Sequence, residues 1–188
     1  MNLRDKAPIL ICVDLEKGFS DEKYWGGGRN NKDAEVICSV IIKEWRDIGL
    51  DIIHIRHSSK DPKSKLHKNN EGFMFNPIAT PLVNETVITK SVNSAFIGTN
   101  LKELIDSKGR NTLVIIGLTT DHCVSTTARM AGNYGYETYI VSDATATFDK
   151  VGADGEHFNS DLIHATALAS LNIEFASVLN SQHLLKIL

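Results

Sequence analysis

Three side chains that could act together in covalent catalysis each follow a short apolar segment of the sequence. They are a carboxylate at Asp14, an ammonium at Lys90 and a thiol at Cys123. In open parallel sheets the carboxyl ends of the strands meet at one edge, and ligands bind there. If the apolar segments are parallel strands, the three side chains converge, and a thiol beside a base and a cation can attack a carbonyl carbon. Each residue alone is consistent with a structural role, so the hypothesis depends on all three together.

Cys123 is the candidate nucleophile of this group. We expect a helix over residues 120–134, so Cys123 would lie in its first turn, where free backbone amides and the helix dipole stabilise a thiolate. The ammonium of Lys90 would lower the thiol pKa further, and Asp14 would act as general base and acid. Amides of the same turn could hold a developing oxyanion. The alternative for Cys123 is a buried structural cysteine.

The sequence around these residues alternates apolar runs with helical patterns. The run from Ile9 to Val13 is continuously apolar, as in a strand that is buried on both faces. Six such strands connected by helices predict an α/β fold with a mostly parallel sheet. The expected strands are Ile9–Val13, Ile52–Ile55, Val87–Thr89, Leu113–Ile116, Thr138–Val141 and Ile173–Val178. The expected helices span residues 36–48, 101–108, 120–134 and 160–171.

The composition limits the classes of function that the chain can have. It has 188 residues, a net charge of −3 and no run of Lys or Arg, so we expect a single domain over residues 1–188 and no nucleic-acid partner. No apolar stretch approaches the ~20 residues of a membrane span, and the N-terminus does not read as a signal peptide. Three widely spaced cysteines, of which Cys12 and Cys38 fit core positions, favour neither disulfides nor a zinc cluster. We therefore expect a soluble cytoplasmic protein without a membrane partner.

Several segments resemble the isochorismatase-like cysteine hydrolases, in the right order and over nearly the whole chain. This superfamily includes nicotinamidases, N-carbamoylsarcosine amidohydrolases, ureidoacrylate and biuret hydrolases, and isochorismatases. The segment Gly117–Val124 is similar to the part of the family that carries the nucleophile, and Ile11–Leu15 is similar to its first-strand motif. The further matching segments are Thr127–Ala128, Thr89–Lys90 with Ser94–Phe96 and Thr99, Asp143–Thr147, and His164–Ala165.

The resemblance implies a three-layer Rossmann-like fold, with a six-stranded sheet in the order 3-2-1-4-5-6 and helices on both faces. It implies a catalytic triad of Asp14, Lys90 and Cys123, and an oxyanion hole formed by the backbone N–H groups of Thr119 and Cys123. A cis peptide bond is implied between Leu118 and Thr119. Members of the family commonly form homo-oligomers, so we expect a dimer or tetramer, and the triad needs no cofactor.

The sequence departs from the family pattern at positions that bear on substrate binding. Glu16 stands where relatives often carry Gln, and Gly18 where they often carry a second Asp. Nicotinamidases bind a metal through an Asp-x-His after the second strand, but here His57 and Ser59 occupy those positions, which is not a carboxylate–imidazole site. We therefore predict no metal and disfavour a nicotinamidase. Chelation by His57 with His67 is the alternative.

Together these features favour a cysteine hydrolase that cleaves the C–N bond of a small amide or carbamoyl compound through a thioester intermediate. Two alternatives stay open: vinyl-ether hydrolysis of isochorismate with Asp14 as the acid, and a non-catalytic member that binds a small molecule. The sequence does not identify the substrate, which depends on two long loops, residues 20–31 and 57–76. The candidate substrate contacts are Phe19, Trp25, His57 and Phe148. Trp25, Phe73, Phe75 and Phe148 form either an apolar wall around the substrate or ordinary anchors of their loops, and the sequence favours neither.

Overall fold

The computed structural model describes residues 2–188, and its centre is a six-stranded parallel sheet. The strand order is β3-β2-β1-β4-β5-β8, and because β8 is the sixth of these strands along the chain, the predicted order is confirmed. The strands of this sheet are β1 (Ile9–Val13), β2 (Ile52–His57), β3 (Thr86–Lys90), β4 (Thr112–Leu118), β5 (Glu137–Ala146) and β8 (Ser177–Leu179). The helices are α1 (Ala34–Asp47), α2 (Leu101–Ser107), α3 (Ser125–Asn133), α4 (Ser160–Leu171) and α5 (Ser181–Ile187).

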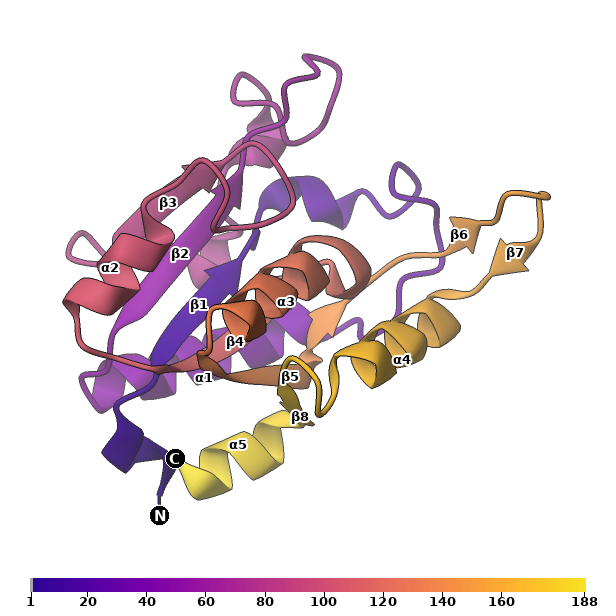
Figure 1. Cartoon of the computed structure of the whole chain (residues 1–188). Helices are drawn as coiled ribbons and strands as arrows, with labels where there is room; N and C mark the ends of the chain where they lie inside the picture. The colour runs from indigo at the N-terminus through magenta and orange to yellow at the C-terminus, as the bar shows by residue number, and fades with distance from the viewer. Residues whose placement is uncertain (1) are drawn as a thin grey trace.

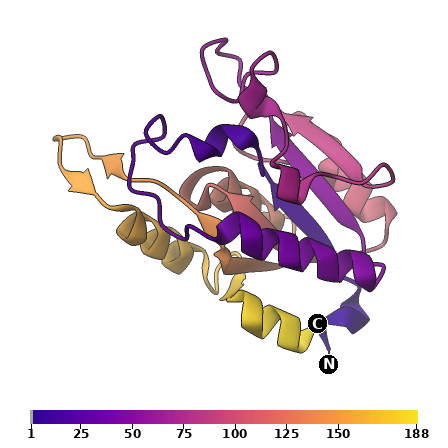
Figure 2. The ribbon, with the colours of Figure 1, turned by 180° about the vertical axis from the view of Figure 1, so that it is seen from behind.

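Helices cover both faces of the sheet, which gives three layers. Helices α2, α3 and α4 lie in front of the sheet in Figure 1, whereas α1 and α5 lie on the opposite face and come to the front in Figure 2. The period of two along a strand explains this: Ile9, Ile11 and Val13 pack into the core beneath α2 and α3, while Leu10 and Cys12 pack beneath α1. Strand β1 is therefore buried on both faces, as its continuous apolar run predicts.

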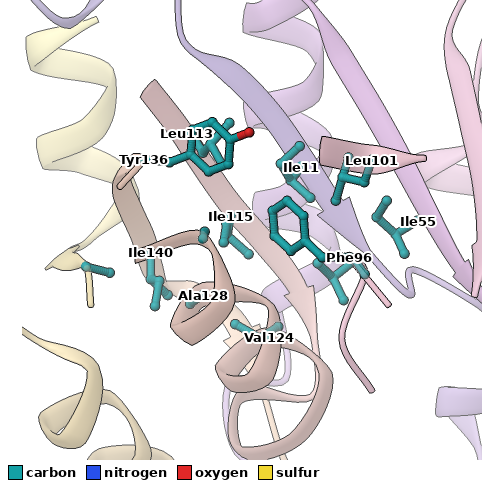
Figure 3. Close-up of a cluster of buried hydrophobic side chains, with 14 of the residues drawn as sticks. Ile11, Ile55, Phe96, Leu101, Leu113, Ile115, Val124, Ala128, Tyr136 and Ile140 are labelled. Carbon is teal, nitrogen blue, oxygen red and sulfur yellow. The ribbon is translucent and has the colours of Figure 1, made fainter. Parts of the chain in front are cut away.

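The front core fixes the end of β4 and the segment that follows it. Figure 3 shows Ile115 of β4 with Val124 and Ala128, which come from the turn after β4 and from α3, packed beside Ile11 of β1. All of these side chains are nearly or fully buried. The segment that carries Cys123 is thus held against the sheet through Val124, and it continues directly into α3.

A glycine allows β1 and β4 to approach closely at their carboxyl ends. Gly117 pairs with Val13, has a φ of +116°, and lies beside an irregularity in the pairing of β4 with β5. A Cβ atom at Gly117 would lie 1.9 Å from the carbonyl oxygen of Val13, so no other residue fits this place. The close approach sets the chain after β4 beside the chain after β1.

The last part of the chain differs from the expectation. The predicted strand Ile173–Val178 is shifted: residues 173–175 form a turn in which Ile173 has a φ of +75° and is exposed, and only Ser177–Leu179 pairs with β5. The apolar run alone did not indicate this turn. Two short strands, β6 (Lys150–Val151) and β7 (His157–Phe158), form an antiparallel hairpin that projects beyond α4 (Figure 1). None of the helices within residues 2–188 is long and apolar enough to span a membrane.

Candidate active site

Asp14, Lys90 and Cys123 lie together at the carboxyl edge of the sheet. Nζ of Lys90 is 2.7 Å from Oδ2 of Asp14 and 3.2 Å from Sγ of Cys123. Lys90 is the last residue of β3, Asp14 directly follows β1, and Cys123 lies in a π-helical turn, Thr120–Val124, after β4. All three residues are buried. The structure therefore brings together three side chains that come from separate strand ends.

A fourth side chain, His57, completes the contacts of the lysine. His57 is the last residue of β2 and pairs with Lys90 in the parallel register of β2 and β3. Its Nδ1 lies 3.1 Å from Nζ of Lys90. Burial lowers the pKa of His57, and the charge of Lys90 lowers it further, so the imidazole is neutral near pH 7 and Nδ1 accepts a hydrogen bond from the ammonium.

The ammonium of Lys90 occupies the place from which a metal ion would contact this cluster. The ligating atoms of Asp14, His57 and Cys123 lie within 4.8 Å of one another, and Nζ is within hydrogen-bond distance of each. His67 is not part of the group, because its Nδ1 accepts the N–H of Asn69 within its own loop. Within residues 2–188, this geometry fits a charged lysine among the three side chains.

The electrostatics of Cys123 differ from the expectation of a stabilised thiolate. Burial raises the thiol pKa well above its ordinary value, the charge of Asp14 raises it further, and Lys90 lowers it only in part. The sequence shows the lysine and the helix start but not the depth of burial, so the predicted lowering of the pKa is wrong. Burial also lowers the pKa of Lys90, but Asp14 and Cys123 raise it by more, so Lys90 keeps its charge. The free site holds a neutral thiol beside a carboxylate–ammonium pair.

Asp14 has one carboxylate oxygen without a hydrogen bond. Oδ2 accepts from Lys90, whereas Oδ1 is buried and has no hydrogen-bond partner among the described residues. The chain turns sharply here, because Asp14 has a φ of +50°, in the left-handed region that few residues other than glycine adopt. A buried acceptor without a partner, close to a thiol, is suited to receive the thiol proton.

The turn between β4 and α3 is held by its own backbone and by α4. The peptide bond between Leu118 and Thr119 is cis. The carbonyl oxygen of Thr119 accepts the N–H groups of His122 and Val124, both at 3.2 Å. From α4, Nδ1 of His164 lies 2.8 Å from Oγ1 of Thr120. These contacts fix the orientation of the backbone that surrounds Cys123.

A small cavity of about 170 Å³ opens beside Cys123. Phe19, Trp25 and Phe148 form one wall as a stacked group: the ring centroid of Trp25 lies 4.8 Å from that of Phe19 and 6.2 Å from that of Phe148. His57 and Thr119 also line the cavity. All four predicted substrate contacts are therefore at this cavity.

For Phe73 and Phe75 the sequence leaves two roles equally open, membership of this wall or anchoring of the loop, and the structure favours the second. They are not among the residues that line the cavity. Instead their rings hold the guanidinium of Arg56, whose carbon lies 4.1 Å from the ring centroid of Phe73 and 5.3 Å from that of Phe75. The two rings stack with a cation on the outer part of the same loop, because an aromatic face attracts a positive charge.

Gly18 explains one departure from the family pattern. The loop 57–76 packs directly on it: a Cβ atom at Gly18 would lie 2.7 Å from Cδ2 of Leu66, and one at Gly72 would lie 2.9 Å from Cα of Gly18. Leu66 and Ser64 of this loop line the cavity. The loop thus lies in close contact with position 18, where a side chain would crowd Leu66. A larger open groove of about 680 Å³ lies along the other side of this contact, next to Lys17 and Glu71, and contains none of the triad residues.

Several cavity residues carry no signal in the sequence that identifies them as site residues. Asn93 lies with Oδ1 at 3.9 Å from Sγ of Cys123, and Lys150 comes from the projecting hairpin. Lys150 and His122 form ion-pair contacts with Asp121, at 3.5 and 3.3 Å, at the edge of the site. Asn93 and Lys150 reach the cavity because a loop and the hairpin fold back toward it. The remaining members of the lining that sequence reasoning did not predict are Ser59, Ser64 and Leu66.

A family model described as an isochorismatase domain matches residues 8–183 of the 188 residues. The chain belongs to the isochorismatase family. It is 47% identical over 181 residues to the isochorismatase family protein YrdC of Bacillus subtilis (strain 168), and this match covers 96% of each chain. These similarities identify the protein as an isochorismatase-family hydrolase and confirm the predicted family.

Two further similarities within the isochorismatase family bear on the fold and on the chemistry of its members. The structure matches the crystal structure of an isochorismatase-family protein from Chromobacterium violaceum with a TM-score of 0.94 and 37% identity, covering 100% of this chain and 96% of the other. The chain is also 32% identical over 157 residues to a maleamate amidohydrolase of Pseudomonas putida, covering 73% of this chain and 71% of that protein. The family therefore includes an enzyme named for amide hydrolysis.

Proposed function

We propose that the protein is a cysteine hydrolase that cleaves the C–N bond of a small amide or carbamoyl compound through a thioester intermediate. One observation carries the proposal: a neutral thiol at a substrate-sized cavity lies beside a carboxylate with a free oxygen, and a buried ammonium bridges the two. A thiol of raised pKa needs a base to become a nucleophile, and Asp14 is in position to be that base.

In the proposed first half-reaction, Asp14 takes the proton from Sγ of Cys123 as the sulfur attacks the carbonyl carbon. The carbonyl oxygen becomes an oxyanion, which accepts hydrogen bonds from the N–H groups of Thr119 and Cys123. The protonated Asp14 then donates its proton to the leaving nitrogen, the C–N bond breaks, and the acyl group remains on sulfur as a thioester. Lys90 stays charged throughout and keeps the carboxylate and the sulfur in contact range.

In the proposed second half-reaction, a water molecule replaces the departed amine. Asp14, again a carboxylate, accepts a proton from this water as the oxygen attacks the thioester carbon. The C–S bond breaks, sulfur recovers the proton from Asp14, and a carboxylic acid leaves. The sum of the two halves is the hydrolysis of an amide by one water molecule, with the protein returned to its starting state.

The size and lining of the cavity favour a small substrate that has an apolar or planar part. Its volume of about 170 Å³ is below the range of ~300–1,000 Å³ for drug-sized ligands, and three aromatic rings form one wall. Among the residues that line it there is one lysine, Lys150, and no aspartate or glutamate. A carboxylate on the substrate would find this ammonium in the lining, where it also contacts Asp121 at 3.5 Å. The similarity to a maleamate amidohydrolase supports including such compounds among the candidates.

The test is the release of ammonia or amine from a panel of small amides, ureas and carbamoyl compounds, each with and without a carboxylate. Cys123→Ala should abolish turnover of any compound that the parent hydrolyses, whereas Cys38→Ser, a thiol change in the core behind the sheet, should leave it. A covalent acyl–Cys123 adduct should appear by mass spectrometry after rapid acid quench. Retention of activity by Cys123→Ala would contradict the thioester step. Release of pyruvate from isochorismate instead would favour vinyl-ether hydrolysis, and no turnover in either assay would favour a binding role.

A further inference from the structure

Glu16 is a second buried carboxyl group at the site, beside Asp14, and the mechanism above does not use it. The residue is 1% exposed and forms an isolated β-bridge with Phe75 of the covering loop. Its Oε1 accepts the backbone N–H of His57 at 2.8 Å. Its Oε2 is buried and has no hydrogen-bond partner within residues 2–188. One side of the carboxyl group is therefore held, and the other is left without a partner.

The nearest ammonium has no hydrogen left for Glu16. A lysine ammonium carries three N–H groups, and Nζ of Lys90 already has three acceptors: Oδ2 of Asp14, Nδ1 of His57 and Sγ of Cys123. The ammonium thus cannot satisfy Oε2 without giving up one of the contacts that define the site.

The other nearby cation does not pair with Glu16 either. The guanidinium of Arg56 lies over the rings of Phe73 and Phe75, its Nε is buried without a hydrogen-bond partner, and no ion pair within 4.0 Å joins a cation to Glu16 in the described part of the chain. The groups that face Glu16 are Asp14 from the end of β1, Arg56 and His57 from β2, and Lys90 from β3. A charged carboxylate here would be buried beside the carboxylate of Asp14 without an ion pair of its own, which is strongly unfavourable.

We propose that Glu16 acts as a protonated carboxylic acid and as a positioning residue of this site: it anchors the backbone of His57 and, by staying neutral, leaves the charge of Lys90 to Asp14 and Cys123. Burial, and then the negative charge of Asp14, raise the pKa of Glu16 to about 9, in agreement with the geometry. The N–H of His57, Lys90 and Arg56 act in the opposite direction and do not outweigh these effects. The positioning role rests on the proposed function, but the protonation state does not.

Loss of the Glu16 proton would change the site in a definite way. The new carboxylate would attract the ammonium of Lys90 and add a second negative charge near Cys123, so the thiol pKa would rise further and Asp14 would be a weaker partner for Lys90. The reactivity of Cys123 in wild-type protein should therefore rise with pH less steeply above the pKa of Glu16 than it would if position 16 stayed neutral.

The first experiment measures the protonation state directly, without a substrate. Protein labelled with ¹³C at the glutamate side-chain carboxyl is titrated by NMR, and the Glu16 resonance is assigned by its loss in Glu16→Gln. The expected result is the shift of a carboxylic acid at neutral pH and a titration near the pKa given above. A Glu16 resonance that titrates in the ordinary range of glutamate would overturn the proposal.

The second experiment tests the effect on the site through the rate at which iodoacetamide alkylates Cys123, followed by peptide mass spectrometry. Glu16→Leu removes the acceptor for His57 and should slow the reaction about fivefold near neutral pH, the effect of about one hydrogen bond. Glu16→Gln keeps a neutral acceptor and should restore the neutral-pH rate. Above the pKa of Glu16, the Gln variant should react about threefold or more faster than wild type, because it cannot acquire the second negative charge.

These outcomes separate the proposal from the proposed function. If Glu16→Gln and wild type share one pH profile, the neutrality of Glu16 does not control the charge of Lys90, and this part of the proposal is wrong whether or not an amide substrate has been found. If no substrate is hydrolysed but Glu16 is protonated and the two profiles diverge, the hydrolase mechanism fails and this inference stands. Should Glu16→Leu not fold, the NMR titration and the Gln comparison decide the matter alone.

Discussion

His57 and Lys90 face each other at the ends of β2 and β3, with Nδ1 of the histidine 3.1 Å from Nζ of the lysine. This contact follows from the register of the two parallel strands, which pairs these two residues. The neutral ring accepts one hydrogen bond from the ammonium, and Asp14 and Cys123 accept the other two. The strand register thereby helps to orient the ammonium of Lys90 toward Asp14 and Cys123.

Removing one partner of the buried ion pair between Lys90 and Asp14 should destabilise the protein strongly. We expect Lys90→Met to lower the free energy of unfolding by about 3–5 kcal/mol, because Asp14 would remain buried without a cation. The double variant Asp14→Asn/Lys90→Met removes both charges and should recover at least half of this loss, without any recovery of hydrolysis. Urea denaturation followed by circular dichroism measures the difference. A double variant no more stable than Lys90→Met would contradict this account of the single change.

Position 117 should not tolerate a side chain, whereas a glycine position that faces open space should tolerate one. We expect Gly117→Ala to destabilise the protein by about 3 kcal/mol or more, because its Cβ would collide with the carbonyl oxygen of Val13. Gly49→Ala is the matched control: it also has a positive φ, +71°, but no atom lies within 4 Å of the added Cβ. It should cost only about 1–2 kcal/mol, the price of the left-handed conformation. Equal thermal unfolding temperatures of the two variants would show that the contact with β1 is not limiting.

Trp25 should report the occupancy of the cavity. It is one of two tryptophans, and it lines the cavity between Phe19 and Phe148, whereas Trp45 is fully buried in the core behind the sheet. A small amide that binds beside Cys123 should change the emission of Trp25, and Trp25→Phe should lose this response while keeping the emission of Trp45. Fluorescence titration of Cys123→Ala measures binding without turnover. A response that persists in Trp25→Phe would place the ligand elsewhere.

Glu85 should make the stability depend on pH in acid. Burial alone would raise its pKa, but hydrogen bonds from Arg46, the N–H of Leu82 and His54 lower it to about 2. Because the folded value is below the unfolded value of about 4.5, the stability is fully present above that pH and is lost as the pH falls toward about 2.

Glu85→Gln should remove this dependence and lower the stability near neutral pH by about 2 kcal/mol, as expected for lost hydrogen bonds to a charged group. Glu71→Gln is the control, because the ion pair of Glu71 with Lys17 is exposed. The measurement is urea unfolding at a series of pH values. If Glu85→Gln retains the wild-type slope of stability in this window, other carboxylates are responsible.

The main elements of the sheet and the convergence of Asp14, Lys90 and Cys123 could be predicted, because strand ends follow from apolar runs and parallel ends share one edge. The contact of His57 with Lys90 could not, since it depends on the register of two strands. The thiol pKa was predicted in the wrong direction because burial outweighs the lysine, and burial depth is a tertiary property. Loop residues such as Asn93 and Lys150 reach the cavity through backbone paths that no period in the sequence encodes.

The homo-oligomer, the cytoplasmic location and the catalytic roles of the individual residues stay predictions. The family and the fold are established by the match over residues 8–183 and by the strand order. The boundaries of the last strand were misplaced because Ile173, although apolar, lies exposed in a turn. Hydrophobicity alone does not separate a strand from an exposed turn of similar composition.

Gly18 and Gly72 pack against each other with no side chain between them, and this contact sets how closely the covering loop approaches the cavity. A Cβ atom at position 18 would lie 2.7 Å from Cδ2 of Leu66 and 3.2 Å from the carbonyl oxygen of Gly72, so the side chain of Leu66 at the cavity would have to shift. Position 18 thus bears on the shape of the cavity through Leu66, although Gly18 itself is not one of the residues that line it.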